Sequence, residues 1–140
     1  PVPDADLARQ REAVDAFLAA ANEGDFEALV GVLHPDVVLR ADAGALPAGG
    51  SRVIRGAPAV AAQALRFARR RDAFPRRALV NGAAGLVATR GGRPLSVLGF
   101  TVTGGRIVEI DILADPQRLA QLDLTELEEG WTDPRPARTH

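Results

Sequence analysis

The sequence contains no cysteine, tyrosine, methionine or lysine, and its only tryptophan is Trp131. Without cysteine the chain has no disulfide bond, no thiolate nucleophile and no thiolate-ligated metal. Its two histidines, His34 and His140, lie far apart in the sequence and have no clustered acids beside them, so they do not form a metal-ligand set. The composition therefore predicts a domain that carries no metal or other cofactor.

The chain also has almost no net charge and no long apolar run. Its 17 basic residues, all arginine, balance 18 acidic residues for a net charge of −1. A chain with this charge balance has no positive electrostatic potential that would attract nucleic acid or an anionic membrane. We therefore expect it to bind neither directly. No segment reads as a signal peptide or a membrane span, which predicts a cytoplasmic protein. The missing initiator methionine, before the opening PVPDAD, fits a piece of a longer protein.

What the chain does have is a β-rich centre. In RPLSVLGFTVTGGRIVEIDIL (residues 93–113), the Gly-Gly pair at 104–105 predicts a hairpin, because both glycines can adopt positive φ. Counting outward from the turn predicts the pairs Val97 with Ile112, Gly99 with Ile110, and Thr101 with Val108. The other face would carry Leu98, Phe100, Val102, Ile107, Glu109 and Asp111. That second face is then either half solvated or lines a cavity that tolerates charge.

Helical patterns precede this hairpin. Asp6 can cap a first helix that ends at Gly24, and Asp25 can cap a second that ends before Pro35. A third helix is predicted from Pro58 to about residue 71. Strands are predicted over 36–42, 52–55, 76–81 and 86–90, with a flexible loop between the first two.

This order predicts an α+β fold in which three helices pack on a curved, mostly antiparallel sheet. The length of 140 residues and a hydrophobic content of 46% suit a single core. We expect one domain over residues 1–124 and a flexible, polar tail over residues 125–140.

Two longer stretches resemble a known family. AFLAAANEGDFEALVGVLHPDVVLRAD and GGRIVEIDIL resemble the SnoaL-like branch of the nuclear transport factor 2 superfamily. The first stretch, together with ALVNGAAGLVATRGGRPLSVLGFTVTGGRIVEIDILADPQRLAQLDL, is similar to the C-terminal domain of bacterial extracytoplasmic-function sigma factors of the sigma-J type. The resemblance implies a cone-shaped fold and a regulatory role in transcription.

The resemblance also locates three chemical positions. Ketosteroid isomerases of this superfamily use a tyrosine on the first helix, a basic carboxylate after the first strand and an acid on the penultimate strand. Aligned on the shared motifs, these positions hold Phe17, Ala41 and Leu98 in this chain. All three are apolar, which disfavours isomerase or cyclase chemistry of those types.

Candidate site residues remain beside these positions. Asp42 is a weak candidate for a catalytic base, and the alternative is an aspartate that caps the following loop. Arg40 and Arg55 could support it or bind an anion, although solvated or salt-bridged arginine is the commoner role. Glu109 and Asp111 read as a polar or interface-facing strand edge. The predicted pocket-lining residues are Phe17, Leu33, Val38, Arg40, Asp42, Arg55, Phe67, Leu98 and Phe100.

The C-terminal segment predicts a docking surface. Its candidate partner-docking residues are Asp115, Pro116, Arg118, Leu119 and Leu122, because large apolar side chains at a chain end gain from burial. The basic run over residues 68–77 reads as a solvated helix end or as a surface for an acidic partner.

Three hypotheses about function follow. The first is a regulatory domain that contacts the DNA-binding segments of its own sigma factor, or RNA polymerase. The second is a stand-alone enzyme or small-molecule binder that uses the cone cavity. The third is a homodimerisation module.

Overall fold

The chain begins with two helices that are capped as the sequence predicts. In the computed structural model, the Ala8 N–H donates a hydrogen bond of 2.9 Å to the Asp6 side chain, which caps α1 (Leu7–Glu23). Gly24 ends α1 in the left-handed region, with φ 71°. Asp25 caps α2 (Phe26–Val32) by accepting from a backbone N–H one turn ahead. The short connection turns α2 back along α1.

The structure describes residues 6–41, 52–68, 74–80, 82–90, 93–113 and 124–126. Its further elements are β1 (Leu33–Ala41), β2 (Arg52–Arg55), α3 (Ala57–Ala68), β3 (Phe74–Val80), β4 (Ala83–Arg90), β5 (Arg93–Thr103), β6 (Arg106–Leu113) and β7 (Leu124–Glu126). None of the helices described is both long and apolar enough to cross a bilayer.

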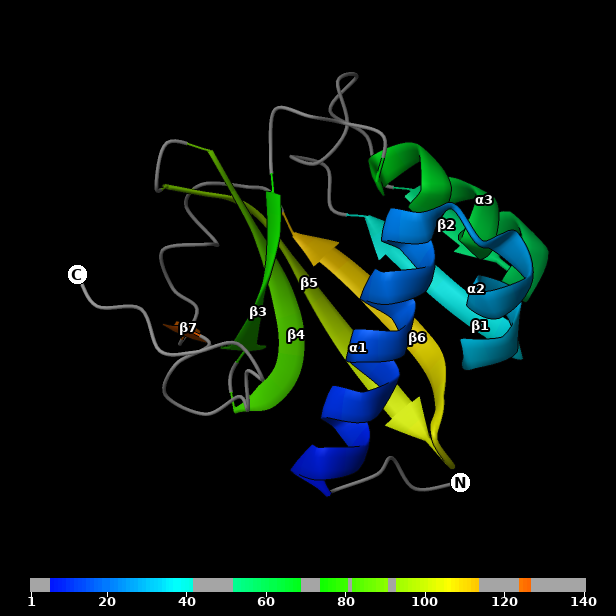
Figure 1. The fold of residues 1–140 in the computed structure, drawn as a ribbon, viewed down its shortest axis with the longest axis horizontal. Coiled ribbons are helices and arrows are strands. Elements are labelled where there is room, and N and C mark those ends of the chain that lie inside the picture. Colours follow the sequence, from blue (N-terminus) through cyan, green and yellow to red (C-terminus); the bar gives the residue numbers. More distant parts are fainter. Residues whose placement is uncertain are drawn as a thin grey trace.

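The strands form one curved sheet in the order β2-β1-β6-β5-β4-β3-β7, and the helices lie on one side of it (Figure 1). Strands β3 to β6 make an antiparallel meander, and β1 pairs parallel with β6. The α+β prediction of three helices on a mostly antiparallel sheet is thus confirmed.

We call the helix-covered side of the sheet the inner face and the opposite side the outer face. The core fills the space between the inner face and the helices. Its largest fully buried side chains include Val14 from α1, Leu29 from α2, Val60 from α3, and Leu33, Leu86, Ile107 and Ile110 from the sheet. Burial of each such side chain contributes about 1.5–3 kcal/mol, so this layer supplies most of the stabilisation.

Two polar contacts join α1 to strands β4 and β3 on the inner face. The Ala84 N–H of β4 donates to Gln10 Oε1 at 3.0 Å, and Arg77 of β3 pairs with Asp15 at 3.3 Å. The core side chain Phe17 lies along the same helix. Helix α1 therefore covers β4 and β5 along its length.

The hairpin turn is confirmed, but the predicted register is wrong. Gly104 and Gly105 have φ 60° and 79°, as a two-residue turn requires. A register shift between Thr101 and Val102 makes Val108 an extra residue in β6. Beyond it the pairs are Thr101 with Glu109, Phe100 with Ile110, Gly99 with Asp111, Leu98 with Ile112, and Val97 with Leu113.

This bulge decides which side chains share a face. Phe100, Ile110 and Ile112 join the core on the inner face, while Glu109 and Asp111 alternate onto the outer face. The sequence-based grouping of both acids with Phe100 is therefore corrected. A shift of one residue exchanges the faces because side chains alternate along a strand.

Strand β7 is an element that the sequence pattern does not predict. Its three residues pair antiparallel with β3, Leu124 opposite Val80 and Glu126 opposite Ala78. The predicted domain boundary after residue 124 falls inside this strand. The flexible loop predicted after residue 42 lies outside the described residues.

Gly85 of β4 has no room for a side chain between β3 and β5. A Cβ at this position would lie 2.7 Å from the Leu98 carbonyl oxygen and 2.8 Å from Val80 Cγ2. Both distances are shorter than the contacts that Cβ atoms make in proteins, and the Leu98 carbonyl oxygen belongs to the backbone, so it cannot rotate away. The position therefore accepts only glycine without a shift of the sheet.

We expect Gly85→Ala to lower the free energy of unfolding by roughly 1–3 kcal/mol, the usual cost of overpacking. Gly99→Ala is the matched control on the adjacent strand, since its nearest obstacle is 4.0 Å away. Urea unfolding of both variants measures the difference. Equal stability of the two variants would contradict the close packing at Gly85.

Candidate functional site

The interior between α1 and the sheet is aromatic and dry. Phe17 of α1 meets Phe100 of β5 edge to face, with ring centroids 5.3 Å apart and an interplanar angle of 67°. Leu33 is buried in the same cluster, and Leu98 packs against it half-buried. Four of the predicted pocket residues are thus brought together between α1 and the inner face: Phe17, Leu33, Leu98 and Phe100. A ligand pocket among them stays a prediction.

The three residues that the family resemblance aligns with isomerase chemistry line this interior. Phe17 and Ala41 are 5% and 6% exposed, and Leu98 packs on the core. No buried side chain among the described residues is polar or charged. The interior as described thus offers neither a proton acceptor nor an oxyanion donor from a buried side chain.

Three other predicted pocket residues lie on the outer face. Val38 and Arg40 alternate with Leu39 and Ala41, whose side chains are in the core, and Arg55 pairs with Val38. The predicted set therefore does not share one face of the sheet. The reason is again strand alternation, which separates Arg40 from Ala41.

The remaining candidates are not placed by the structure. Asp42 and the docking residues Asp115, Pro116, Arg118, Leu119 and Leu122 lie outside the described residues. Phe67 belongs to α3, but its side chain is also outside what the structure describes.

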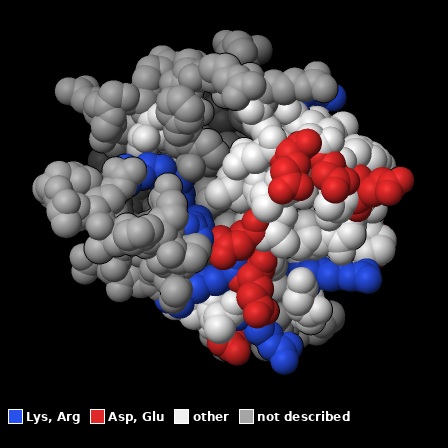
Figure 2. All heavy atoms as spheres, viewed as in Figure 1, with Lys and Arg blue, Asp and Glu red and all other residues white. Residues whose placement is uncertain are grey.

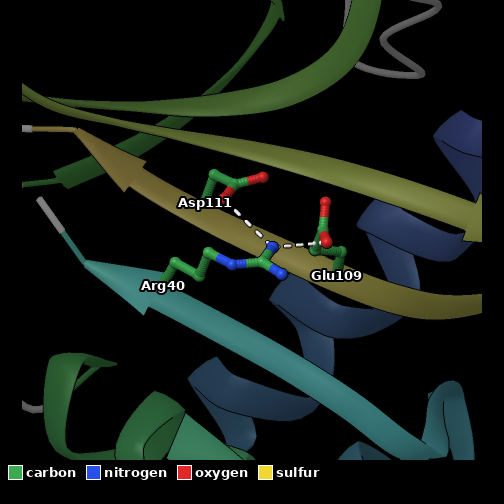
Figure 3. A network of polar contacts seen from close by, with 3 residues as sticks. All are labelled: Arg40, Glu109 and Asp111. Atoms are coloured by element: carbon green, nitrogen blue, oxygen red, sulfur yellow. Dashed lines mark hydrogen bonds and ion pairs between the residues drawn. The ribbon is translucent and has the colours of Figure 1, made fainter. Parts of the chain in front are cut away.

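A charged network occupies the outer face where β1 meets β6. Arg40 reaches across from β1 to both acids of β6, with α1 behind the sheet (Figure 3). Its Nη1 donates to Glu109 Oε2 and lies 3.8 Å from Asp111 Oδ1. The parallel register pairs Arg40 with Asp111, and it pairs Glu109, two residues earlier on β6, with Val38.

The network changes the proton affinity of two of its members. Partial burial raises the pKa of the Asp111 carboxyl, the charge of Glu109 raises it further, and Arg40 acts against both. The hydrogen bond to Glu109 and its charge raise the pKa of Arg40. The side chains of Arg40 and Asp111 are 48% and 54% exposed, so water screens these pairs.

Sequence reasoning found the members of this network but not the network itself. Glu109 and Asp111 stand out as alternating acids, and Arg40 as an arginine expected to be solvated or salt-bridged. Nothing local links residue 40 to residue 111, because only the parallel pairing of β1 with β6 brings them together. Within the described ranges, no three histidine, aspartate or glutamate side chains gather as metal ligands.

The helical side of the molecule has a mixed surface. Acidic side chains gather over α1 and over α2, with arginine side chains beside those on α1 (Figure 2). The exposed Phe26 at the start of α2 is 41% accessible. Both signs of charge therefore occur on the described part of this face.

Solved structures share this arrangement of helices and sheet. The extracytoplasmic-function sigma factor SigJ of Mycobacterium tuberculosis is 26% identical over 79% of this chain, with a TM-score of 0.63. An NTF2-like protein of unknown function from Mesorhizobium loti is 18% identical, with 81% of this chain and 97% of that chain covered and a TM-score of 0.59. This chain has the nuclear transport factor 2-like fold.

Enzymes share the fold as well. A steroid delta-isomerase from Pseudomonas aeruginosa is 20% identical over 81% of this nuclear transport factor 2-like chain and 93% of its own, with a TM-score of 0.56. The present chain spans 44% of the SigJ chain that it matches. No family model and no curated protein matches the sequence. The fold alone therefore does not choose between regulation and catalysis.

The raised pKa of Asp111 makes stability depend on pH. The folded state binds the proton of the Asp111 carboxyl more tightly than the unfolded state does. Protonated Asp111 therefore stabilises the folded state fully below the ordinary pKa of 3.8, and this stabilisation is lost as pH rises through the raised pKa. We expect Asp111→Asn to abolish this decline in the thermal midpoint. Glu12→Gln, at an exposed acid on α1, is the control and should retain it.

Arg40→Ala should act in the opposite direction. Without the guanidinium, the pKa of Asp111 rises further, so the decline extends to higher pH. A pH series of thermal midpoints for the three variants is the measurement, and an Arg40→Ala curve that matches the parent curve would contradict the network.

Proposed function

We propose that this domain is the C-terminal regulatory domain of an extracytoplasmic-function sigma factor. In this role it modulates transcription initiation by contacting the DNA-binding segments of the same polypeptide or RNA polymerase. The observation that carries the proposal is the similarity to SigJ, which covers 79% of this chain and 44% of the sigma factor. The rest of the SigJ chain has no counterpart in this sequence, and we propose that the full protein contains sigma-factor segments besides this domain.

The apolar interior supports a non-catalytic role. An isomerase needs a general base and oxyanion donors within hydrogen-bond reach of its substrate. The corresponding positions here are Phe17, Ala41 and Leu98, and the first two are packed in the core. Contacts rather than chemistry are the function that such a domain can perform.

The partner contacts that we propose involve the C-terminal residues Asp115, Pro116 and Arg118, with the outer-face network of Arg40 and Glu109 as a second polar surface. Charged groups on exposed surfaces set the register and specificity of a contact more than its affinity. An intramolecular contact needs little affinity of its own, because the tether supplies a high effective concentration.

The alternative is an enzyme or binding protein with Asp42 as base. The similarity to a steroid delta-isomerase favours it only at the level of the fold. Arg40, the proposed electrostatic support, is already engaged by Glu109 and Asp111 on the outer face. This arrangement weakens the enzyme hypothesis.

We expect the purified domain to isomerise a Δ5-3-ketosteroid no faster than buffer, because no base or oxyanion donor occupies the known positions. Formation of the conjugated enone, followed by its absorbance, is the measurement, with an active ketosteroid isomerase as positive control. Turnover that disappears in Asp42→Asn, a substitution that keeps the size of the side chain and removes the base, would favour the enzyme instead.

The regulatory proposal predicts that an in-frame sigma-factor region is encoded upstream of Pro1. In the full-length factor, deletion of residues 6–140 should change promoter-specific transcription in vitro by at least about fivefold, the lower range of coupling between sites. Asp115→Ala with Arg118→Ala should reproduce part of that change, whereas Glu12→Gln should not. A start codon directly before Pro1, or an unchanged transcript level after the deletion, would refute the proposal.

A further inference from the structure

Strand β2 forms one edge of the sheet, and no described strand lies on its far side. The sheet order begins with β2, which pairs only with β1 among the described strands. The residues of this strand, Arg52–Arg55, are exposed apart from the half-buried Ile54. An edge strand presents unpaired backbone N–H and C=O groups to which another chain can add a strand. The edge of β2 is therefore a candidate interaction surface.

The pairing with β1 determines which backbone groups of β2 point to the free side. The Gly56 N–H donates to the Val37 carbonyl oxygen at 2.8 Å, and the β1–β2 register, continued by one residue, makes these two residues direct partners. In an antiparallel pair, residues that bond to the neighbouring strand alternate with residues that do not. Ile54 therefore bonds to β1, whereas Val53 and Arg55 direct their N–H and C=O groups away from it. These two residues can supply the donors and acceptors for an added strand.

The side chains of the same two residues lie on the outer face. Val53 pairs with Arg40, and Arg55 pairs with Val38, and both partners on β1 belong to that face. Val53 is 52% exposed, so an apolar side chain placed opposite it would remove apolar surface of both residues from water. The edge thus combines backbone groups for pairing with an apolar side chain for contact.

The arginines of β2 have no acidic partner in the described part of the chain. Neither Arg52 nor Arg55 forms an ion pair or a side-chain hydrogen bond with a described residue. The acids of β6, Glu109 and Asp111, lie two strands away and contact Arg40 instead. Acidic side chains opposite the two arginines would complement this charge, because opposite charges on paired strands stabilise the pair.

The same charges disfavour a second copy of this chain at the edge. Two β2 strands side by side would bring together both arginines of each copy, and β2 contains no acid to offset them. Charged side chains on an edge strand are a common protection against pairing of like edges. The edge of β2 therefore selects an acidic strand over its own copy.

We propose that the edge of β2 binds an extended acidic segment of a partner protein as an added strand. The backbone of that segment bonds to the N–H and C=O groups of Val53 and Arg55. An apolar side chain covers Val53, and acidic side chains face Arg52 and Arg55. In this mode of recognition the main-chain bonds supply affinity and the side chains supply specificity. The inference goes beyond the proposed function and does not depend on it.

A fluorescein-labelled peptide with the core Glu-Val-Val-Glu meets these requirements in either strand direction. It places an acid opposite each arginine of β2 and a valine opposite Val53. Fluorescence anisotropy with the 140-residue chain should show saturable binding, with a Kd below about 1 mM, that weakens as salt is added. A peptide with the core Lys-Val-Val-Lys should bind at least about fivefold more weakly. No saturable binding of the acidic peptide, or equal binding of the two peptides, would overturn the proposal.

Val53→Pro tests whether the contact uses the backbone at the edge. Proline removes the N–H that points to the free side, and an edge strand tolerates it where that N–H has no partner in the sheet. The thermal midpoint should change by less than about 2 °C, and the affinity for the acidic peptide should fall at least about tenfold. Val53→Thr keeps the N–H and should bind within about threefold of the parent chain. Equal affinities of the two variants would refute strand addition.

Two further measurements apply even if Val53→Pro folds poorly. Arg52→Gln with Arg55→Gln should lower the affinity at least about fivefold and reduce its salt dependence, whereas Arg9→Gln, at an exposed arginine of α1, should not. Unchanged affinity in the double variant would contradict the acidic partner. Sedimentation of the chain without peptide tests the second copy. A monomer agrees with the proposal, and a dimer that Val53→Pro dissociates would overturn it.

Discussion

The parallel pairing of β1 with β6 is the contact on which the rest of the molecule depends. It joins the N-terminal half, in which β1 follows the helical hairpin, to the C-terminal meander. Through it, Leu39 and Ala41 extend the apolar inner face of the meander, so that α1, α2 and α3 share one core. Without this pairing the helices would have only part of a sheet to cover. The same register places Arg40 beside Asp111 on the opposite face.

The inner face is apolar where the structure describes it, with no buried polar or charged side chain. The edge-to-face contact of Phe17 with Phe100 packs two aromatic rings between α1 and the sheet. An apolar interior of this kind adds dispersion and burial energy, and a buried polar group without a partner would cost roughly 1–3 kcal/mol. Polar groups at these positions would therefore need hydrogen-bond partners, whereas the apolar side chains found there pack without them.

The outer face is organised differently, with a charged half and an apolar half. The charged half holds Glu109 and Asp111 close to one arginine, and partial burial raises the pKa of Asp111. The apolar half is small, and its three buried side chains come from three adjacent strands.

The sequence by itself determined the local features, because each depends on a few neighbouring residues. Asp6 and Asp25 cap their helices, Gly24 ends the first, and the Gly-Gly turn closes the central hairpin. Through the family resemblance it also predicts that the known catalytic positions are apolar in this chain. Only the tertiary structure decided which side chains share a face, since the bulge at Val108 moves Glu109 and Asp111 away from Phe100. The contacts of Arg40 and the pairing of β7 were likewise beyond the sequence, because they join residues that meet only when distant strands come together in one sheet.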